Sequence, residues 1–393
     1  MIAHTRNVSL LAASQALMLS AVVLSMTLAG ILGATLAPDK GLATLPIAAM
    51  VVGTAIASIP ASLLMRRLGR RTGFLIGAAL GIAGSGLAAT GLQMQSFSTF
   101  VVGHLLLGTY QGFANYFRFA AAEAAGPEQA SRAISWVVAG GVVAAFAGPQ
   151  IAVWGRDWLP QHAFVGSYMA QGLLSLAAMA LLSRLDLPRV ATAAGDAARS
   201  LREIVAQPAL RAAVVGAAVG YAVMIMAMTA TPLAMLGCGF GTGEVKPVIQ
   251  WHVFGMFAPS FFTGALVARF GAPRVMQMGF LLLIGHVAIA ASGVEYLHFL
   301  SALVLLGVGW NFAFVGGTAL LTQTYRPSEQ TKVQALNEGL VFSLVALGSL
   351  GAGWIYDRFG WATLNLAVLP LLILALIWTQ ASMRRKPVLP ATA

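Results

Sequence analysis

The chain contains few charged residues and a single cysteine. Only 9% of its 393 residues are Asp, Glu, Lys or Arg, whereas 59% are hydrophobic and the mean hydropathy is +0.83. A soluble domain of this size carries far more charge, so the composition indicates a polytopic membrane protein, all-α in fold class. The lone Cys238 excludes an intrachain disulfide and any metal site built from several thiolates.

Motifs for catalysis and nucleotide binding are also missing. The chain has no G-x-S-x-G nucleophile elbow, no G-x-x-x-x-G-K phosphate loop and no paired carboxylates inside its apolar segments. We therefore expect neither an enzyme nor an ATP-driven pump, and no prosthetic group. The first apolar segment lacks a small-residue cleavage site, which predicts a retained span rather than a removed signal peptide.

Long apolar runs make up most of the chain. A helix needs about 20 mainly apolar residues to cross a bilayer. Hydropathy on this criterion predicts twelve transmembrane helices, at approximately 8–36, 43–65, 74–92, 98–125, 133–153, 164–182, 209–236, 248–268, 275–292, 297–324, 333–356 and 362–382.

The basic residues lie mainly on one side of this arrangement. With a cytoplasmic amino terminus, eighteen of the 23 Lys and Arg fall in cytoplasmic segments, and only Lys40, Arg156, Lys246 and Arg358 fall outside. Such an asymmetry is the positive-inside pattern of inner-membrane proteins. It predicts that both termini are cytoplasmic and that the net charge of +11 reflects topology in a lipid bilayer rather than a nucleic-acid partner.

The chain divides into two similar halves. A polar segment at 183–208 separates a predicted six-helix bundle at 1–182 from a second at 209–393. R-L-G at 67–69 recurs as R-F-G at 269–271, and L-G-T-Y-Q-G-F-A-N from Leu107 matches L-G-V-G-W-N-F-A-F from Leu306. Both copies of each motif fall on the same side of the membrane, which indicates a parallel repeat.

Two predicted helices near the middle of the chain carry soft donor atoms at a spacing of four. Met224 and Met228 precede a glycine-rich loop, and His252 and Met256 follow it. This spacing puts both members of a pair on one helix face. Thioethers with an imidazole suit Cu(I), and histidine is costly in lipid unless it has a role. The alternative is that methionine is simply a flexible apolar filler.

Four further residues form a weaker, secondary metal path in this hypothesis. At the 202-residue offset of the repeat, Met26 corresponds to Met228 and Met50 to His252. Cys238 offers a soft ligand in the loop, and His104 lies in the fourth predicted helix. Apolar packing explains the methionines equally well, and hydrogen bonding between helices explains His104.

Arg118 is the only Lys or Arg buried deep within a predicted span, whereas Arg211 lies at the cytoplasmic start of one. Glu123 and Glu338 are its candidate partners, because charges within a membrane usually line a cavity and pair with one another. An ion pair at the cytoplasmic gate and a contact with an organic or anionic substrate both fit this pattern.

These features together resemble the major facilitator superfamily, whose loop signature ends in D-R-x-G-R-[RK]. Residues 62–71 read S-L-L-M-R-R-L-G-R-R, and a second copy at 264–271 reads G-A-L-V-A-R-F-G; Arg66 and Ala268 replace the aspartate. Gly-Pro at 148–149 also resembles the glycine–proline motif of the fifth helix. The resemblance implies two parallel-repeat six-helix bundles, transport by alternating access, and a gating role for the loop arginines Arg67 and Arg269.

Within the superfamily, the chain resembles bacterial copper importers of the CcoA type, which carry M-x-x-x-M on the seventh helix and H-x-x-x-M on the eighth. That resemblance implies a monomeric Cu(I) importer of the inner membrane that supplies cytochrome c oxidase assembly. Copper would be the transported ion, exchanged with periplasmic or cytoplasmic copper-handling proteins. Relatives of these importers are thought to carry riboflavin, so the alternative is an organic-solute carrier in which Arg118, Tyr221, Trp251 and Trp310 favour a riboflavin-like substrate.

Overall fold

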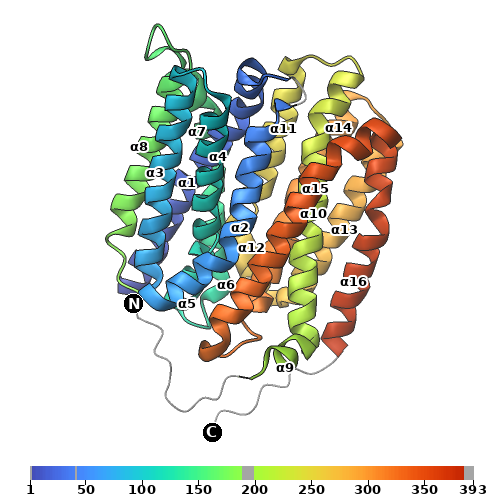
Figure 1. The fold of residues 1–393 in the computed structure, drawn as a ribbon. Helices are drawn as coiled ribbons and strands as arrows, with labels where there is room; N and C mark the ends of the chain where they lie inside the picture. The colour runs from blue at the N-terminus through green and yellow to red at the C-terminus, as the bar shows by residue number, and fades with distance from the viewer. Residues whose placement is uncertain (1, 40–41, 188–198, 385–393) are drawn as a thin grey trace. The chain divides into compact units, whose positions relative to one another are not determined.

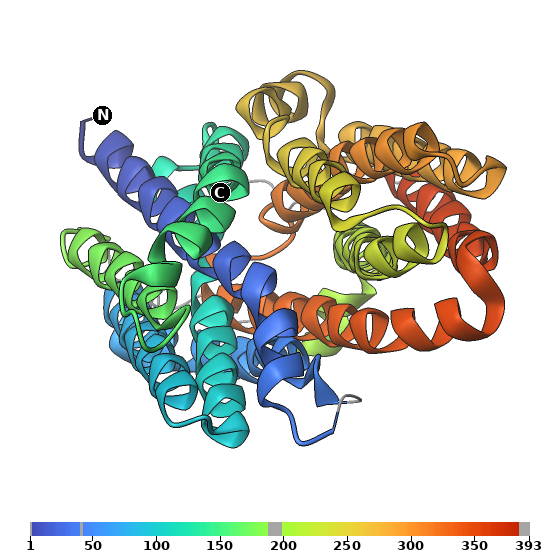
Figure 2. The same cartoon turned by 90° about the horizontal axis from the view of Figure 1, so that it is seen from above.

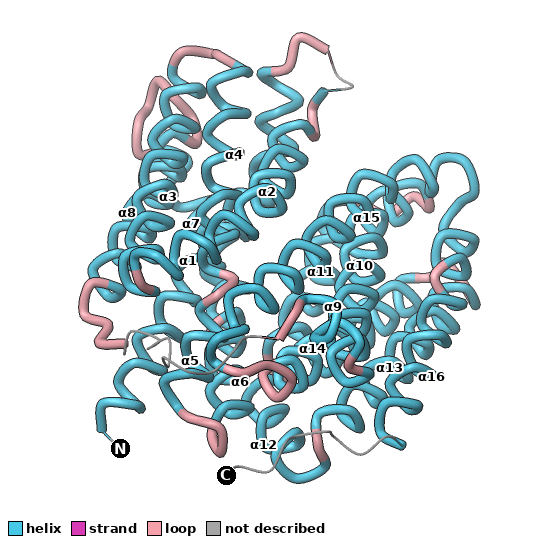
Figure 3. Tube along the Cα trace, turned by 60° about the horizontal axis from the view of Figure 1, so that its bottom comes forward, coloured by secondary structure: helices cyan, strands magenta, loops and turns pink. Residues whose placement is uncertain are grey.

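A computed structural model describes residues 2–39, 42–187 and 199–384. Within these ranges the chain forms helices joined by loops, and no strand occurs among them (Figure 3). Ten helical stretches of the described chain are long and apolar enough to cross a membrane, judged by length and composition. The all-α prediction is therefore confirmed.

Two local features account for the difference between ten stretches and twelve predicted spans. The predicted span 98–125 is broken at Asn115–Tyr116 into α4 (Phe97–Ala114) and α5 (Phe117–Ala125), and α4 is not among the ten. The predicted spans 333–356 and 362–382 fall in one continuous stretch, Pro327–Ala381. Within it, α15 (Gln330–Ala367) has a non-helical turn at Gly360, whose φ of 75° is a conformation that glycine adopts readily.

One compact unit consists of Met1–Ala191 together with Gln334–Leu350 of α15. In this unit α4 packs against both α2 and α3, and α1 packs against α7 and α8 (Figure 1). The remaining bounds are α1 (Ile2–Leu36), α2 (Leu45–Leu68), α3 (Arg70–Gln93), α6 (Ala130–Ala139), α7 (Gly141–Trp154), η2 (Gly155–Asp157) and α8 (Val165–Leu182).

The second unit consists of Thr192–Val333 and Gly351–Ala393. Here α14 packs against α10, α11, α12 and α13, and α16 lies beside α13 and α10 (Figure 2). The bounds are α9 (Leu201–Ala206), α10 (Pro208–Gly237), α11 (Thr242–Phe257), α12 (Ser260–Phe270), α13 (Ala272–Ser292), α14 (Tyr296–Leu321), η3 (Pro327–Glu329) and α16 (Leu369–Arg384).

The sequence repeat recurs as a repeated packing contact. A Cβ atom added to Gly108 on α4 would overlap the backbone oxygen of Met50 on α2. In the second unit a Cβ atom on Gly307 of α14 would lie 2.5 Å from the backbone oxygen of His252 on α11. Small residues let membrane helices approach this closely. Each unit therefore contains the same close contact between a glycine of one helix and the backbone of its neighbour, at positions related by the repeat.

The two copies of the basic loop also end their helices alike. Gly69 caps α2 with a φ of 88°, and Gly271 caps α12 with a φ of 84°. Glycine takes this left-handed conformation without the steric penalty that a side chain incurs, and it commonly terminates helices.

Candidate functional site

A cluster of four aromatic rings lies where α10, α11 and α14 of the second unit meet. We call Tyr221, Phe257, Trp310 and Phe314 the aromatic cluster. The rings of Trp310 and Phe314 stack with centroids 4.9 Å apart and planes 14° apart. Tyr221 lies edge-on to both, at 5.2 and 5.3 Å, and Phe257 lies edge-on to Trp310 at 5.7 Å. Aromatic pairs in these orientations stabilise a protein by more than the burial of their surface area alone would.

The local sequence explains this arrangement. Trp310 and Phe314 are four residues apart on α14, so their side chains share one face of the helix. Gly220, next to Tyr221, lets α10 come close to α14: a Cβ atom at Gly220 would lie 3.1 Å from the Cβ atom of Ala313. Trp310 is only 2% exposed, and its Nε1 has no hydrogen-bond partner among the described residues.

The corresponding positions of the first unit, at the end of α4 and just after it, carry amides. Aligning the repeat from Leu107 and Leu306 places Gln111 opposite Trp310 and Asn115 opposite Phe314. Asn115 Nδ2 is buried and, within the described chain, without a hydrogen-bond partner. These equivalent positions of the repeat therefore differ in chemistry: they carry amides in the first unit and aromatic rings in the second.

Arg118 on α5 forms a buried ion pair with Glu338 on α15. Arg118 Nη2 lies 2.6 Å from Glu338 Oε1, and Arg118 Nη1 donates to the backbone oxygen of Asn115 at 2.7 Å. Asn337 Nδ2 donates to the same Glu338 oxygen at 2.7 Å. Of the two carboxylates that the sequence offers as partners, the structure brings Glu338 to Arg118.

Glu123 instead pairs with Arg70, which the sequence analysis did not select. Arg70 Nη2 lies 2.7 Å from Glu123 Oε1, and Gln334 Nε2 donates to that oxygen at 3.3 Å. Arg67 and Arg269 are exposed, and no ion pair involves either of them in the described part of the chain. The signal for Arg70 was its position directly after the glycine of the loop signature.

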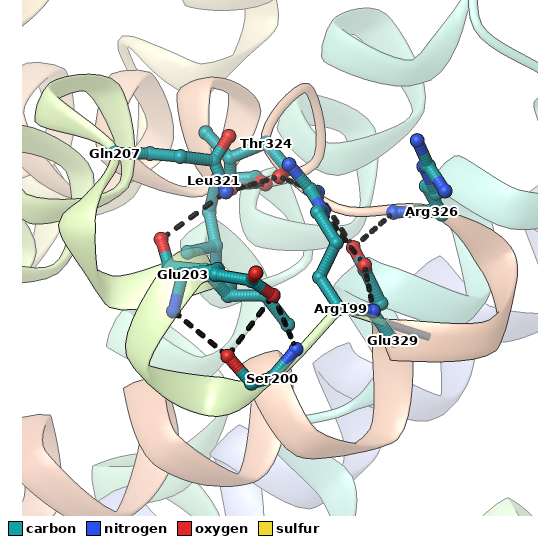
Figure 4. A network of polar contacts seen from close by, with 9 residues as sticks. Arg199, Ser200, Glu203, Gln207, Leu321, Thr324, Arg326 and Glu329 are labelled. Atoms are coloured by element: carbon teal, nitrogen blue, oxygen red, sulfur yellow. Dashed lines mark hydrogen bonds and ion pairs between the residues drawn. The ribbon is translucent and has the colours of Figure 1, made fainter. Parts of the chain in front are cut away.

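A second polar network, shown in Figure 4, anchors the start of α9. Arg199 forms a bidentate ion pair with Glu329: Nε and Nη2 each lie 2.7 Å from a carboxylate oxygen. The hydrogen bond to Glu329 raises the pKa of Arg199. Ser200 and Glu203 form a capping box at the helix start, and the backbone N–H of Ser200 lowers the pKa of Glu203. Sequence reasoning missed this network because Arg199 and Glu329 are 130 residues apart.

Comparison with known proteins identifies the family. The chain is 40% identical over 388 residues to the riboflavin transporter RfnT of Brucella anthropi, which covers 98% of this chain and 97% of that protein. It is 30% identical to the uncharacterized MFS-type transporter YddS of Bacillus subtilis, over 88% of this chain and 85% of that protein. The Major Facilitator Superfamily model matches residues 246–392. The chain belongs to the major facilitator superfamily.

Solved structures of the superfamily share this fold. The outward conformation of the transporter FucP aligns with a TM-score of 0.78 at 17% identity, covering 95% of this chain and 98% of that one. The human organic anion transporter MFSD10 aligns with a TM-score of 0.74 at 14% identity, covering 96% and 99%. Together with the apolar helices, membership of the superfamily makes this chain a multi-pass membrane transporter of a small-molecule substrate.

The prediction of copper import is wrong. A protein that is 40% identical over 98% of this chain is a riboflavin transporter, and this supports an organic-solute carrier instead. The comparisons give no support to the closer resemblance to copper importers or to copper-handling partners, and the assignment of individual Met and His residues as metal ligands stays a prediction. Methionine and histidine at a spacing of four do not distinguish a metal path from the packed interior of a membrane helix.

The residues of the metal hypothesis are mostly buried. Met224, Met256 and His252 are 1%, 6% and 0% exposed, and Met228 is half-buried. His252 Nδ1 hydrogen-bonds to the backbone oxygen of Leu303 at 2.8 Å, which ties α11 to α14. Its Nε2 is buried without a hydrogen-bond partner in the described residues.

The four residues of the predicted secondary metal path lie in different environments from one another. His104 hydrogen-bonds through both ring nitrogens, to the Phe100 backbone oxygen at 2.9 Å and the Tyr168 hydroxyl at 3.2 Å. Met50 is buried beside Gly108, and Met26 is half-buried on α1. Cys238 is exposed at the end of α10. No group of three or more His, Cys, Asp or Glu that could hold a metal occurs in the described residues.

Proposed function

We propose that this chain carries riboflavin, or a closely similar organic solute, across the inner membrane by alternating access. The observation that supports the proposal is the 40% identity to the riboflavin transporter RfnT, which extends over nearly the whole length of both proteins. A match of this extent and identity carries information about the substrate, whereas a shared fold alone leaves the substrate open.

The chemistry of the described residues fits such a solute. Riboflavin combines a flat tricyclic ring, which bears carbonyl groups and an imide N–H, with a hydroxylated chain. Small-molecule sites are mainly apolar and aromatic, with a few polar groups that fix orientation. The aromatic cluster of the second unit supplies the aromatic part of such a site, and the indole N–H of Trp310 is a polar group within it.

The proposal includes the organisation expected from the sequence. The six-helix bundles are residues 1–182 and 209–393, the linker is 183–208, and both termini are cytoplasmic. We propose that the Arg118–Glu338 pair and the Arg70–Glu123–Gln334 contacts stabilise one state of the transport cycle. They join α3 and α5 to α15, so moving these helices apart requires breaking them.

The test is uptake of radiolabelled riboflavin into proteoliposomes that contain the purified protein. We expect saturable uptake that unlabelled riboflavin competes away, and protein-free liposomes provide the background. Growth of a riboflavin-auxotrophic bacterium without its own importer, at low external riboflavin, gives an independent readout. Absence of saturable riboflavin uptake by folded, correctly inserted protein would refute the proposal.

A further inference from the structure

The indole of Trp310 contains a polar group that the protein does not satisfy. Its Nε1–H is a hydrogen-bond donor only, the side chain is 2% exposed, and no described residue accepts the bond. A buried donor without an acceptor costs free energy, so such a group in a native protein requires an explanation. A ligand that brings an acceptor to this position is one such explanation.

The surroundings of this donor favour a flat aromatic ligand. Trp310 stacks on Phe314 at 4.9 Å, and Tyr221 and Phe257 approach Trp310 edge-on at 5.2 and 5.7 Å. Tyr221 is also partly exposed, unlike Trp310. The partly exposed Tyr221 is therefore the ring of the cluster that a further ring can reach, in the offset-stacked or T-shaped contacts that aromatic groups prefer.

The repeat argues against packing as a sufficient reason for these rings. Gly108 and Gly307 make equivalent close contacts, so α4 and α14 are held by the same kind of interface. The equivalent of Trp310 on α4 is nevertheless Gln111, and the equivalent of Phe314 is Asn115. The helix interface therefore does not demand aromatic residues on this face.

We propose that the aromatic cluster is the subsite for the tricyclic ring of the solute, in which Trp310 Nε1 donates a hydrogen bond to a ring carbonyl. This inference rests on the proposed function and assigns one part of recognition within it. The hydroxylated chain of the solute is then bound elsewhere, because the cluster contains no carboxylate or amide that would recognise several hydroxyl groups.

The decisive variant is Trp310→Phe, which keeps an aromatic ring but removes the N–H donor. In proteoliposomes we expect the KM for riboflavin to rise about threefold to tenfold, the usual value of one hydrogen bond, with the maximal rate within about twofold of wild type. Trp354→Phe is the matched control, because Trp354 lies on α15 with 61% of its surface exposed. Its KM should equal that of wild type.

Two competitors separate ring recognition from chain recognition. Lumichrome has the tricyclic ring and carbonyl groups without the hydroxylated chain, and D-ribitol is that chain alone. Lumichrome should compete with riboflavin in wild type and lose about the same factor in Trp310→Phe as riboflavin does. Ribitol competition should be the same in both proteins. Riboflavin uptake that lumichrome does not inhibit would overturn the inference.

The outcomes distinguish the inference from the function on which it rests. Wild-type protein without riboflavin uptake refutes the proposed function. Normal wild-type uptake with an unchanged KM in Trp310→Phe refutes only the ring subsite. If Trp310→Phe does not fold, Phe314→Leu decides the question, because it removes the ring stacked on Trp310 and leaves the indole in place. A raised KM for that variant supports the subsite, and an unchanged KM overturns it.

Discussion

Arg118 and Glu338 form an ion pair in which neither side chain is more than 5% exposed, and the two nearest atoms are 2.6 Å apart. The residues are 220 positions apart in the chain. Removing two charges from water costs free energy that offsets most of their mutual attraction. Such a buried pair therefore contributes little net stability to the folded protein. Removing one partner is a different matter, because the other charge then stays buried without compensation.

This asymmetry gives the first prediction. Arg118→Leu should destabilise the purified protein by about 3–5 kcal/mol, whereas Arg118→Leu combined with Glu338→Leu should recover a large part of that loss. Thermal unfolding in detergent, compared at one pH and ionic strength, measures both. Equal destabilisation by the single and the double variant would contradict the buried pair.

The glycine contacts of the repeat give the second prediction. Gly307→Ala would put a Cβ atom 2.5 Å from the His252 backbone oxygen and should cost about 1–3 kcal/mol. Gly285→Ala on α13 is the control, since no atom lies within 4 Å of its added Cβ. That change should be neutral or stabilise the helix by up to about 1 kcal/mol. Unfolding temperatures of the two variants should therefore move in opposite directions or differ clearly.

Cys238 tests the proposed orientation. It is the only cysteine in the chain and is exposed at the end of α10. If both termini are cytoplasmic, a membrane-impermeant maleimide should label Cys238 in intact spheroplasts without prior permeabilisation. Cys238→Ser should remove the label entirely. Labelling that appears only after the membrane is opened would reverse the topology.

The correction from copper to an organic solute leads to the fourth prediction. A membrane-impermeant Cu(I) chelator should leave riboflavin uptake unchanged, and Met228→Leu should keep its rate within about twofold of wild type, since Leu and Met are close in volume. Both are measured in the same proteoliposome assay. A strong loss of riboflavin uptake on chelation would show that a metal takes part in transport.

The sequence alone was sufficient to predict the helices and the internal repeat, but it did not identify the substrate. Long apolar runs and the copies at Leu107 and Leu306 point to the all-α fold and its family without any long-range information. The prediction of copper import was wrong because a spacing of four occurs on every helix, and methionine serves equally as soft ligand and as apolar filler. The hydrogen bond from His252 goes to Leu303, 51 residues away, and only the tertiary structure reveals it.

The ion pairs also could not be predicted fully from the sequence. Sequence placed Arg118, Glu123 and Glu338 together as candidates, because charges are rare in membrane helices. It could not decide which carboxylate belongs to which arginine, and it overlooked Arg70, the partner of Glu123. Pairing depends on which helices are neighbours, and that is set by packing along the whole chain.

The glycine faces of α4 and α14 have a consequence for how such carriers diversify. Gly108 and Gly307 make the same close contact although the residues three and seven positions later differ between the two copies, so those positions can be exchanged without losing the contact. In a duplicated fold of this kind, the glycine contacts that hold the helices together can be kept while the side chains near them change. A new substrate specificity can then arise from a few substitutions in one half of the transporter, while the other half keeps its original residues.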